Sequence, residues 1–260
     1  MDEAEEPQVY FNYRGSEYPS WGNLSGRYRT SDYDQGKFNR YAKLGDMADE
    51  LESGFQHLVE SDIGSVDGRC AYAALLMMNY GVRVGNEDSA EGYVSSMKQS
   101  KGETVQTFGT TTLRNKHINF IDGKMDLHFL GKEQVENYVS IDDPFLVKYG
   151  KLFVQNSPDE KWLGIDYDMM FDFVKRSVGE GFVPKDFRTF CANVTAWNVI
   201  EEKLGNPKPD TRTEVNAEVA DIVEVVSARL QNTPGIAKRN YIDNRMLDWF
   251  KNQRFDYGDT

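Results

Sequence analysis

Apolar residues recur every three or four positions over most of this chain, which is the spacing of helices that bury one face. The first such run covers residues 35–58. The second, residues 70–80, is almost entirely apolar and predicts a central buried helix. We expect Asp67 to cap this second helix and Gly81 to end it, because these residue types favour those two positions.

Further helices are predicted in the second half of the chain. The same spacing covers residues 145–154, 167–178, 185–204 and 213–230, and an amphipathic run follows at 242–250. Asp143 and Pro144 precede the first of these as a cap and a first-turn proline. The clearest loop is the stretch 205–209, which is rich in glycine and proline.

The period changes to two between His117 and Ile141, as in strands with one buried face. Three such stretches follow one another, at residues 117–121, 125–130 and 135–141. The first two are joined by Asp122 and Gly123, a residue pair that two-residue hairpin turns favour. These patterns predict a mainly α fold with a small three-stranded antiparallel β-sheet.

Residues 1–33 have no clear periodicity and are rich in Tyr, Gly, Ser and Asp. We interpret them as an irregular N-terminal extension. Its aromatic side chains are expected to pack on the rest of the protein, namely Tyr10, Phe11, Tyr13 and Trp21. Residues 34–260 then form the main domain, since a chain of 260 residues is long enough for one domain with an appendage.

Charge and apolar content limit the possible classes of function. The formal net charge of −12 argues against general nucleic-acid binding, but basic residues dominate the segments 98–132 and 229–254. These segments are compatible with DNA binding that weakens as salt rises. The longest apolar run, residues 71–78, is too short to cross a bilayer, and the N-terminus lacks the features of a signal peptide. We therefore expect no membrane association and a cytoplasmic location, and we expect Cys70 and Cys191 to be buried, reduced thiols.

One tyrosine near the end of the chain, Tyr241, closely follows Lys238 and Arg239. A tyrosine can act as a nucleophile through its phenolate, and neighbouring cations attract a phosphodiester. The same residues are also compatible with a solvated helix face. Catalytic partners would have to come from the rest of the chain.

Five other polar residues stand at turns or at a helix start. Arg83 lies on the turn after the buried helix, Lys132 at the end of a strand and Asn232 in a turn. Arg188 and Lys185 open a helix. Positive charge at a helix N-terminus opposes the helix dipole, which indicates a role other than helix stability.

Five segments occur in the order and approximate spacing of the signature segments of one enzyme family. They read GVRVGNE, TFGTTTLRNKHI, LHFLGKEQV, VPKDFRTF and LQNTPGIAKRNYI. In these segments the chain resembles the type IB DNA topoisomerases of the poxvirus and bacterial kind, over residues 35–251. The resemblance implies the catalytic fold that type IB topoisomerases share with tyrosine recombinases, which agrees with the fold class predicted from periodicity.

The resemblance also implies a role for each candidate residue. Tyr241 corresponds to the nucleophile, Arg83 and Arg188 to the two active-site arginines, and Lys132 to the hairpin lysine, our candidate for the general acid. Asn232 stands where the poxvirus enzymes have histidine; bacterial members resemble this chain in having asparagine there. We expect Asn232 to donate a hydrogen bond to the phosphate. Five more basic residues are expected to contact DNA phosphates: Arg114, Lys116, Lys185, Lys238 and Arg239.

The activity that the resemblance implies is relaxation of duplex DNA, preferably supercoiled, through a 3′-phosphotyrosyl intermediate. We expect a monomer that is nucleoid-associated or viral and needs neither ATP nor metal. No cofactor is expected, because His57, His117 and His128 form no ligand cluster at a recognisable spacing and no glycine-rich phosphate loop is present. Residues 1–33 are too few for the N-terminal β-rich domain that the family normally carries.

Two alternatives remain open. A tyrosine recombinase or integrase has the same chemistry, but recombinases usually have His-x-x-Arg where this chain has Lys185-Asp186-Phe187-Arg188, and they carry an N-terminal helical domain. A catalytically silent DNA-binding relative is compatible with the acidic charge. The retained tyrosine, arginines and lysine argue against this second alternative.

Overall fold

The computed structural model describes residue 7 and residues 9–20, 32–92 and 105–255, without the side chains of Val9, residues 32–35, Lys37, Phe38 and Glu133. Trp21, a predicted packing residue, and part of the predicted basic segment 98–132 lie outside the described residues. The chain forms two compact units: a terminal unit of Met1–Asp49 with Thr189–Thr260, and a middle unit of Glu50–Arg188. The sequence predicts a different division, between an extension that ends at residue 33 and a catalytic domain that begins at residue 34. This division stays a prediction.

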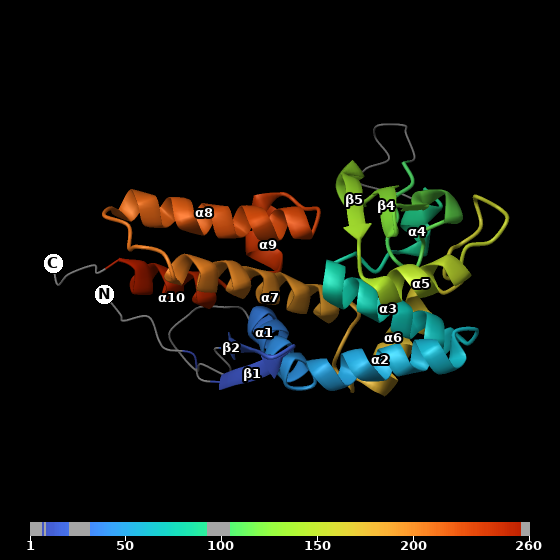
Figure 1. Ribbon diagram of the computed structural model, residues 1–260, viewed down its shortest axis with the longest axis horizontal. Helices are drawn as coiled ribbons and strands as arrows, with labels where there is room; N and C mark the ends of the chain where they lie inside the picture. Colours follow the sequence, from blue (N-terminus) through green and yellow to red (C-terminus); the bar gives the residue numbers. More distant parts are fainter. Residues whose placement is uncertain (1–6, 8, 21–31, 93–104, 256–260) are drawn as a thin grey trace. The chain divides into compact units, whose positions relative to one another are not determined.

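The middle unit holds the helices that lie between residues 48 and 177, together with the start of one more helix (Figure 1). They are α2 (Ala48–Asp62, which starts two residues before the unit), α3 (Val66–Tyr80), α4 (Glu87–Ala90), α5 (Pro144–Leu152) and α6 (Tyr167–Ser177), followed by the first turn of α7 (Lys185–Leu204). Two 3₁₀ helices, η2 (Asn115–His117) and η3 (Lys132–Gln134), flank strands of the sheet. As predicted, Asp143 caps α5 and Pro144 opens it.

The buried helix α3 ends as predicted but begins differently. Gly81 adopts a left-handed φ of 65° and its N–H donates to the Met77 carbonyl at 3.1 Å. The cap at the start is Ser65, whose hydroxyl accepts from the Gly68 N–H at 2.9 Å, so the prediction that Asp67 caps the helix is wrong. Because Ser65 already fills that position, the Asp67 carboxylate lies in the first turn and pairs with Arg176 at 2.7 Å.

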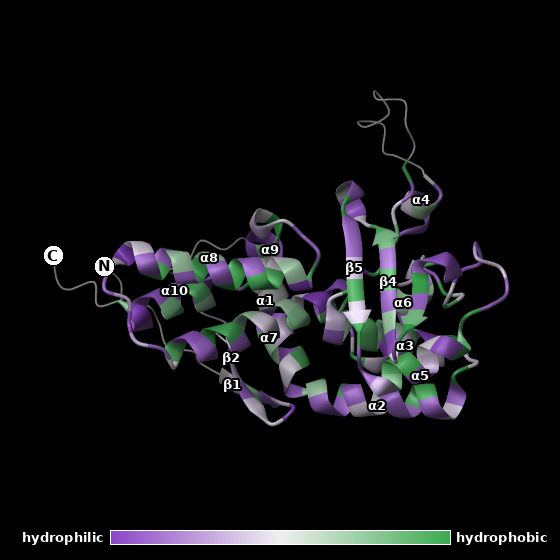
Figure 2. Ribbon diagram, turned by 45° about the horizontal axis from the view of Figure 1, so that its top comes forward, coloured by the Kyte–Doolittle hydropathy of each residue, from purple (hydrophilic) through white to green (hydrophobic). Residues whose placement is uncertain are grey.

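The sheet of the middle unit has three antiparallel strands in the order β3 (Ile118–Ile121), β4 (Lys124–Leu130) and β5 (Glu136–Ile141). Asp122 and Gly123 both have positive φ, of 50° and 78°, and make the predicted two-residue turn between β3 and β4. Figure 2 shows β4 alternating between hydrophobic and hydrophilic positions. Its buried face is formed by Met125, Leu127 and Phe129, and α5 packs against this strand.

The core of the middle unit centres on a fully buried tryptophan. Trp162 meets Tyr72 and Phe153 edge to face, with ring centroids 5.6 and 6.3 Å apart. Its indole N–H donates to the Gly150 carbonyl at 3.1 Å, and the Tyr72 hydroxyl donates to the Leu146 carbonyl at 2.7 Å. Both polar atoms are therefore satisfied inside an apolar cluster, which fixes α3 and α5 to each other.

The terminal unit begins with a β-hairpin, so the prediction of an irregular extension is wrong for its described part. Strands β1 (Val9–Tyr13) and β2 (Ser16–Ser20) pair antiparallel across Arg14 and Gly15, which both have positive φ. Phe11 and Tyr13 pack as predicted, against Phe190 at 6.0 and 5.0 Å between ring centroids, whereas Tyr10 is 47% exposed. The alternation of apolar and polar residues in β1 and β2 is short and is interrupted by polar residues, so periodicity did not predict these strands.

The helices of the terminal unit follow the prediction in part. They are α1 (Asp32–Asp46), α7 from Thr189 onward, α8 (Arg212–Arg229), α9 (Pro234–Asn240) and α10 (Asn244–Arg254). The apolar run predicted over residues 35–58 is two helices, because α1 ends at Asp46 and α2 begins at Ala48. Helix α9 was not predicted as a helix. The last helix, α10, is anchored by Arg254, which is 2% exposed and donates to Glu218 at 2.6 and 2.9 Å.

Two predictions of composition can be compared with the described part of the chain. Cys70 and Cys191 are buried free thiols, as expected. Burial raises the pKa of the Cys70 thiol to about 12. Among the described residues, no helix has the length and apolar content needed to cross a membrane.

Candidate active site

The five predicted catalytic residues are divided between the two units. Arg83, Lys132 and Arg188 lie in the middle unit, and Asn232 and Tyr241 lie in the terminal unit. Within the middle unit, Arg83 and Arg188 are linked through a single loop.

Arg83 lies on the loop between α3 and α4, and a second loop holds its backbone. The Arg83 carbonyl accepts from both the N–H and the hydroxyl of Thr110, at 2.6 and 2.8 Å. The Val84 carbonyl accepts from the N–H and the hydroxyl of Thr111 in the same way, at 2.7 and 2.9 Å. Four hydrogen bonds thus fix the peptide groups on which the Arg83 side chain stands.

Two glycines let these loops approach so closely. A Cβ on Gly109 would stand 2.5 Å from the Gly85 nitrogen and 2.7 Å from the Arg83 carbonyl oxygen. Gly85 has a φ of 103°, and a Cβ there would meet the hydroxyls of Thr111 and Thr112 at 2.8 Å. We call this contact between residues 83–85 and 109–112 the glycine interlock. Through it the segments GVRVGNE and TFGTTTL meet in the structure.

Arg188 is buried in the first turn of α7, with 3% of its surface exposed. One nitrogen of its guanidinium donates to the carbonyl of Gly81, the residue that ends α3 two positions before Arg83. The start of α7 is itself held by Asp186, whose carboxylate accepts from the Val183 N–H at 2.9 Å. Asp186 also offsets the unfavourable charge of Lys185 and Arg188 at this helix end.

Lys132 projects from a tight turn between β4 and β5. Its side chain is exposed, while the turn is closed by the Gly131 N–H donating to the Val135 carbonyl at 2.8 Å. The Asn137 side chain donates to the same carbonyl at 2.8 Å and fills the space where a Cβ on Gly131 would stand. Lys132 therefore presents an exposed ammonium on a turn that is closed by hydrogen bonds.

Asn232 stands directly after α8, in a turn of defined geometry. Gln231 adopts a left-handed φ of 49°, its N–H donates to Ala228, and the Asn232 N–H donates to Ser227 at 2.9 Å. This pair of hydrogen bonds is the Schellman pattern that commonly ends helices. The turn leaves Asn232 half-buried, with its backbone position set by α8.

Tyr241 follows the last residue of α9 and is 4% exposed. Its N–H donates to the Ala237 carbonyl at 3.0 Å. Its own carbonyl accepts from the side chain of Asn193 on α7 at 2.9 Å, and the other end of this amide accepts from the Asp243 N–H at 2.8 Å. Asn193 is fully buried, and no sequence motif pointed to it.

Two of the predicted phosphate contacts already have partners within the protein. Lys116 pairs with the Asp159 carboxylate at 2.6 Å, which lowers the pKa of that carboxyl. Arg114 donates to the Asp159 carbonyl at 2.9 Å and lies over the Phe108 ring, 5.8 Å from its centroid. Both members of the Lys116 pair are exposed, so solvent and phosphate can compete for the ammonium.

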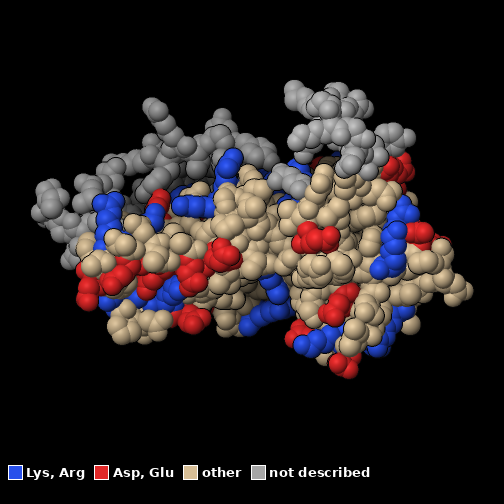
Figure 3. Space-filling view, turned by 90° about the horizontal axis from the view of Figure 1, so that it is seen from above, with Lys and Arg blue, Asp and Glu red and all other residues tan. Residues whose placement is uncertain are grey.

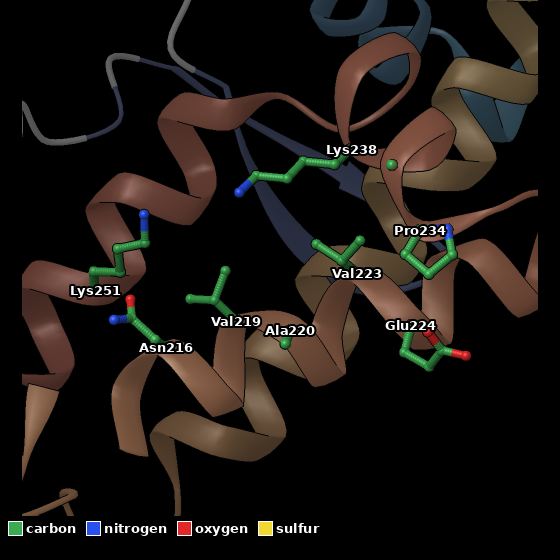
Figure 4. A pocket seen from close by; sticks show the side chains of 9 residues that line it. Asn216, Val219, Ala220, Val223, Glu224, Pro234, Lys238 and Lys251 are labelled. Atoms are coloured by element: carbon green, nitrogen blue, oxygen red, sulfur yellow. The ribbon is translucent and has the colours of Figure 1, made fainter. Parts of the chain in front are cut away.

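The other three predicted phosphate contacts, Lys185, Lys238 and Arg239, are exposed side chains. Lys238 also borders a groove of about 420 Å³ between α8, α9 and α10. Figure 4 shows the valines Val219 and Val223 among the residues that line this groove, together with Lys238 and Lys251. The groove is a feature of the terminal unit that the sequence did not indicate.

His117 has a structural role that the strand pattern did not reveal. It lies at the end of η2, and its Nδ1 accepts from the Arg114 N–H at 3.0 Å. Its ring centroid is 4.3 Å from that of Phe108. Burial, followed by the charges of Lys116 and Arg114, lowers the pKa of His117 to about 4. The ring is therefore neutral near pH 7 and serves as an acceptor.

Helix α8 carries an acidic surface. Glu214, Asp221 and Glu224 are exposed along this helix. Figure 3 shows acidic side chains gathered at the left of the view, over the terminal unit. Such a surface repels a polyanion. Over residues 7, 9–20, 32–92 and 105–255, no three His, Cys, Asp or Glu side chains are grouped so as to hold a metal ion.

Comparison with known protein families shows the class of protein to which the chain belongs. Residues 27–254 match the family described as "Eukaryotic DNA topoisomerase I, catalytic core". The chain belongs to this family of DNA topoisomerase catalytic cores, and the predicted resemblance is confirmed. The mainly helical fold with its small three-stranded sheet fits the family.

Individual relatives include viral and animal proteins. The chain is 25% identical to the DNA topoisomerase 1B of Acanthamoeba polyphaga mimivirus over 190 residues, 68% of this chain and 53% of the relative. It is 27% identical to the DNA topoisomerase 1B of vaccinia virus (strain Copenhagen) over 157 residues, 58% and 47% of the two chains. Human DNA topoisomerase 1 is 26% identical over 181 residues, 64% of this chain and 21% of the human protein. The chain thus spans about half the length of the viral relatives.

Proposed function

We propose that this protein relaxes duplex DNA by cutting one strand, letting the duplex swivel and resealing the cut. The observation that carries the proposal is the linkage of two arginines in a topoisomerase catalytic core. The guanidinium of Arg188 binds the carbonyl of Gly81, and the loop that follows Gly81 carries Arg83 and is locked by the glycine interlock. Such preorganised cations suit the extra negative charge of a phosphoryl transition state.

The proposed reaction is a transesterification. The Tyr241 phenolate attacks a backbone phosphorus, the bond to the 5′ oxygen breaks, and a 3′-phosphotyrosyl link remains with a free 5′-hydroxyl. Arg83 and Arg188 donate to the non-bridging oxygens, and Asn232 adds a neutral donor. In the reverse step the 5′-hydroxyl attacks the phosphotyrosyl bond and releases Tyr241. The bond energy is conserved, so no ATP is consumed.

Lys132 is proposed to give the proton that the leaving 5′ oxygen needs. Its position supports this role, because an exposed lysine on a closed hairpin turn can enter a groove of DNA without distorting the sheet. We propose Arg114, Lys116, Lys185, Lys238 and Arg239 as phosphate contacts, with Lys116 first having to leave Asp159. All five catalytic residues are on one chain, so a monomer is sufficient, and supercoiled DNA is the preferred substrate because relaxation releases its torsional energy.

The test is plasmid relaxation in EDTA without ATP, over a series of salt concentrations. We expect the unmodified protein to relax supercoiled DNA and to be trapped on it covalently by detergent. Tyr241→Phe should abolish both signals, since the ring remains but the nucleophilic oxygen is lost. Relaxation by Tyr241→Phe would disprove the assignment of the nucleophile. The family match favours this activity over a recombinase; recombination of paired sites without relaxation would reverse that choice.

A further inference from the structure

Tyr241 lies at a junction between two helices, where no regular element fixes its backbone. Helix α9 ends at Asn240, Tyr241 has φ −130° and ψ −41°, and α10 begins at Asn244. The direction in which the phenol points therefore depends on what holds residues 241–243. Asn193 spans this junction, as described above, with one end of its amide on the Tyr241 carbonyl and the other on the Asp243 N–H.

The side chain of Asp243 is held in turn by Arg245. The guanidinium donates from Nε to Oδ1 at 2.9 Å and from Nη2 to Oδ2 at 2.6 Å, and the Arg245 N–H donates to Oδ1 at 3.1 Å. Both side chains are almost fully buried, with 8% of the Arg245 side chain and 3% of the Asp243 side chain exposed. The planar guanidinium thus engages both oxygens of the Asp243 carboxylate, an arrangement that fixes its orientation as well as its distance.

A cap for α10 does not require this ion pair. Serine or asparagine supplies the same acceptor without a charge. The desolvation of a buried pair roughly cancels its attraction, so such pairs often add little to stability compared with apolar side chains of similar size. What Asp243 and Arg245 add that a neutral cap would not is a single defined geometry for the residues that follow the tyrosine.

We propose that Asp243 and Arg245 are positioning residues for the nucleophile. Their buried pair holds the peptide after Tyr241 in one orientation, and through it the phenol is aimed for in-line attack. The inference rests on the proposed function, in which Tyr241 attacks the phosphorus. Neither residue touches the DNA in this role.

A second ion pair, between α10 and α8, provides a matched control. Arg254 and Glu218 form a fork of the same chemistry, with donor distances of 2.9 and 2.6 Å and exposures of 2% and 20%. This pair joins the end of α10 to α8 and has no contact with the junction at residues 241–243 among the described hydrogen bonds. It tests whether loss of any buried pair in the terminal unit slows the reaction.

The experiment compares two double variants with the unmodified protein. Asp243→Asn with Arg245→Met keeps the cap acceptor of α10 and leaves no orphan charge. Glu218→Gln with Arg254→Met likewise leaves no orphan charge at the control pair. For each we would measure the urea unfolding midpoint, the dissociation constant for duplex DNA, and the relaxation rate with enzyme in excess over plasmid. Detergent trapping at each time point reports the covalent adduct.

We expect the Asp243/Arg245 double variant to bind DNA as tightly as the parent and to relax it about 10²-fold more slowly, the loss typical of a misplacement of about 1 Å. The Glu218/Arg254 double variant should relax DNA at the parent rate once corrected for the folded fraction. Relaxation at the parent rate by the Asp243/Arg245 variant would overturn the inference. So would equal slowing of both variants. If the unmodified protein gave neither relaxation nor adduct, the proposed function itself would fail, and this inference with it.

Discussion

A single methyl group at position 109 should separate the two loops that hold Arg83. In Gly109→Ala the new Cβ would start 2.5 Å from the Gly85 nitrogen, whereas ordinary contact begins at 3.4 Å, so the loops must part by about 0.9 Å. The neighbouring atoms are backbone, which cannot rotate away as a side chain can. We expect a loss of about 1–3 kcal/mol in the free energy of unfolding from this overpacking.

The larger effect should be on catalysis. A displacement near 1 Å in a positioning element costs about 10²-fold in rate, which corresponds to about 2.7 kcal/mol of barrier. We would measure plasmid relaxation with enzyme in excess, at a temperature where urea titration shows the variant folded, together with DNA affinity. The control is Gly54→Ala on α2 of the same unit, where a Cβ meets nothing within 4 Å. That variant should gain up to about 1 kcal/mol in stability and keep the parent rate. A folded Gly109→Ala protein that relaxes DNA at the parent rate would refute the idea that the interlock positions Arg83.

Three further outcomes are expected. Arg254→Met should lower the free energy of unfolding by about 3 kcal/mol in urea titration, since it leaves a partly buried carboxylate without its partner; a loss below about 1 kcal/mol would contradict the anchoring role of this residue. The folded pKa of His117 is about 4, below its usual value of 6.5, so its contribution to stability is complete above about pH 6.5 and is lost as pH falls toward 4. The urea midpoint of His117→Asn should therefore fall less between pH 7 and pH 4.5 than that of the parent. An equal fall of the midpoint in both proteins would exclude His117 as a source of acid sensitivity. Asn232→His should keep measurable relaxation, because imidazole can also donate to a phosphate oxygen; complete loss would show that the turn after α8 accepts only asparagine.

Local patterns were sufficient to predict much of the fold. The predicted helix 185–204 coincides with α7, and the turn at Asp122 and Gly123 and the end of α3 at Gly81 are confirmed. These features are encoded by neighbours in sequence: periodicity, backbone propensity and capping. The break at Met47 was missed because the apolar spacing continues across it, so nothing in the pattern marks the end of α1. Helix α9 was missed because it has only seven residues and one fully buried side chain, Ala237.

The candidate site divides in the same way. Arg83, Lys132, Arg188 and Tyr241 could be named from the sequence because their segments resemble those of a known family. The contacts around them could not be predicted, because they join residues far apart in the chain. Examples are the hydrogen bond of Asn193 to the Tyr241 carbonyl across 48 positions and that of Arg188 to Gly81 across 107. Periodicity carries no information about such pairs.

The glycine interlock implies that the signature segments do not evolve independently of one another. GVRVGNE and TFGTTTL meet through Gly85 and Gly109, where added atoms would collide. A larger residue at either glycine needs a compensating change in the facing loop, so we expect positions 85 and 109–112 to covary among relatives. VPKDFRTF joins them through the bond from Arg188 to Gly81. Three of the five segments are therefore not three independent signs of common descent. The most informative substitutions in any lineage are paired ones at positions 85 and 109–112.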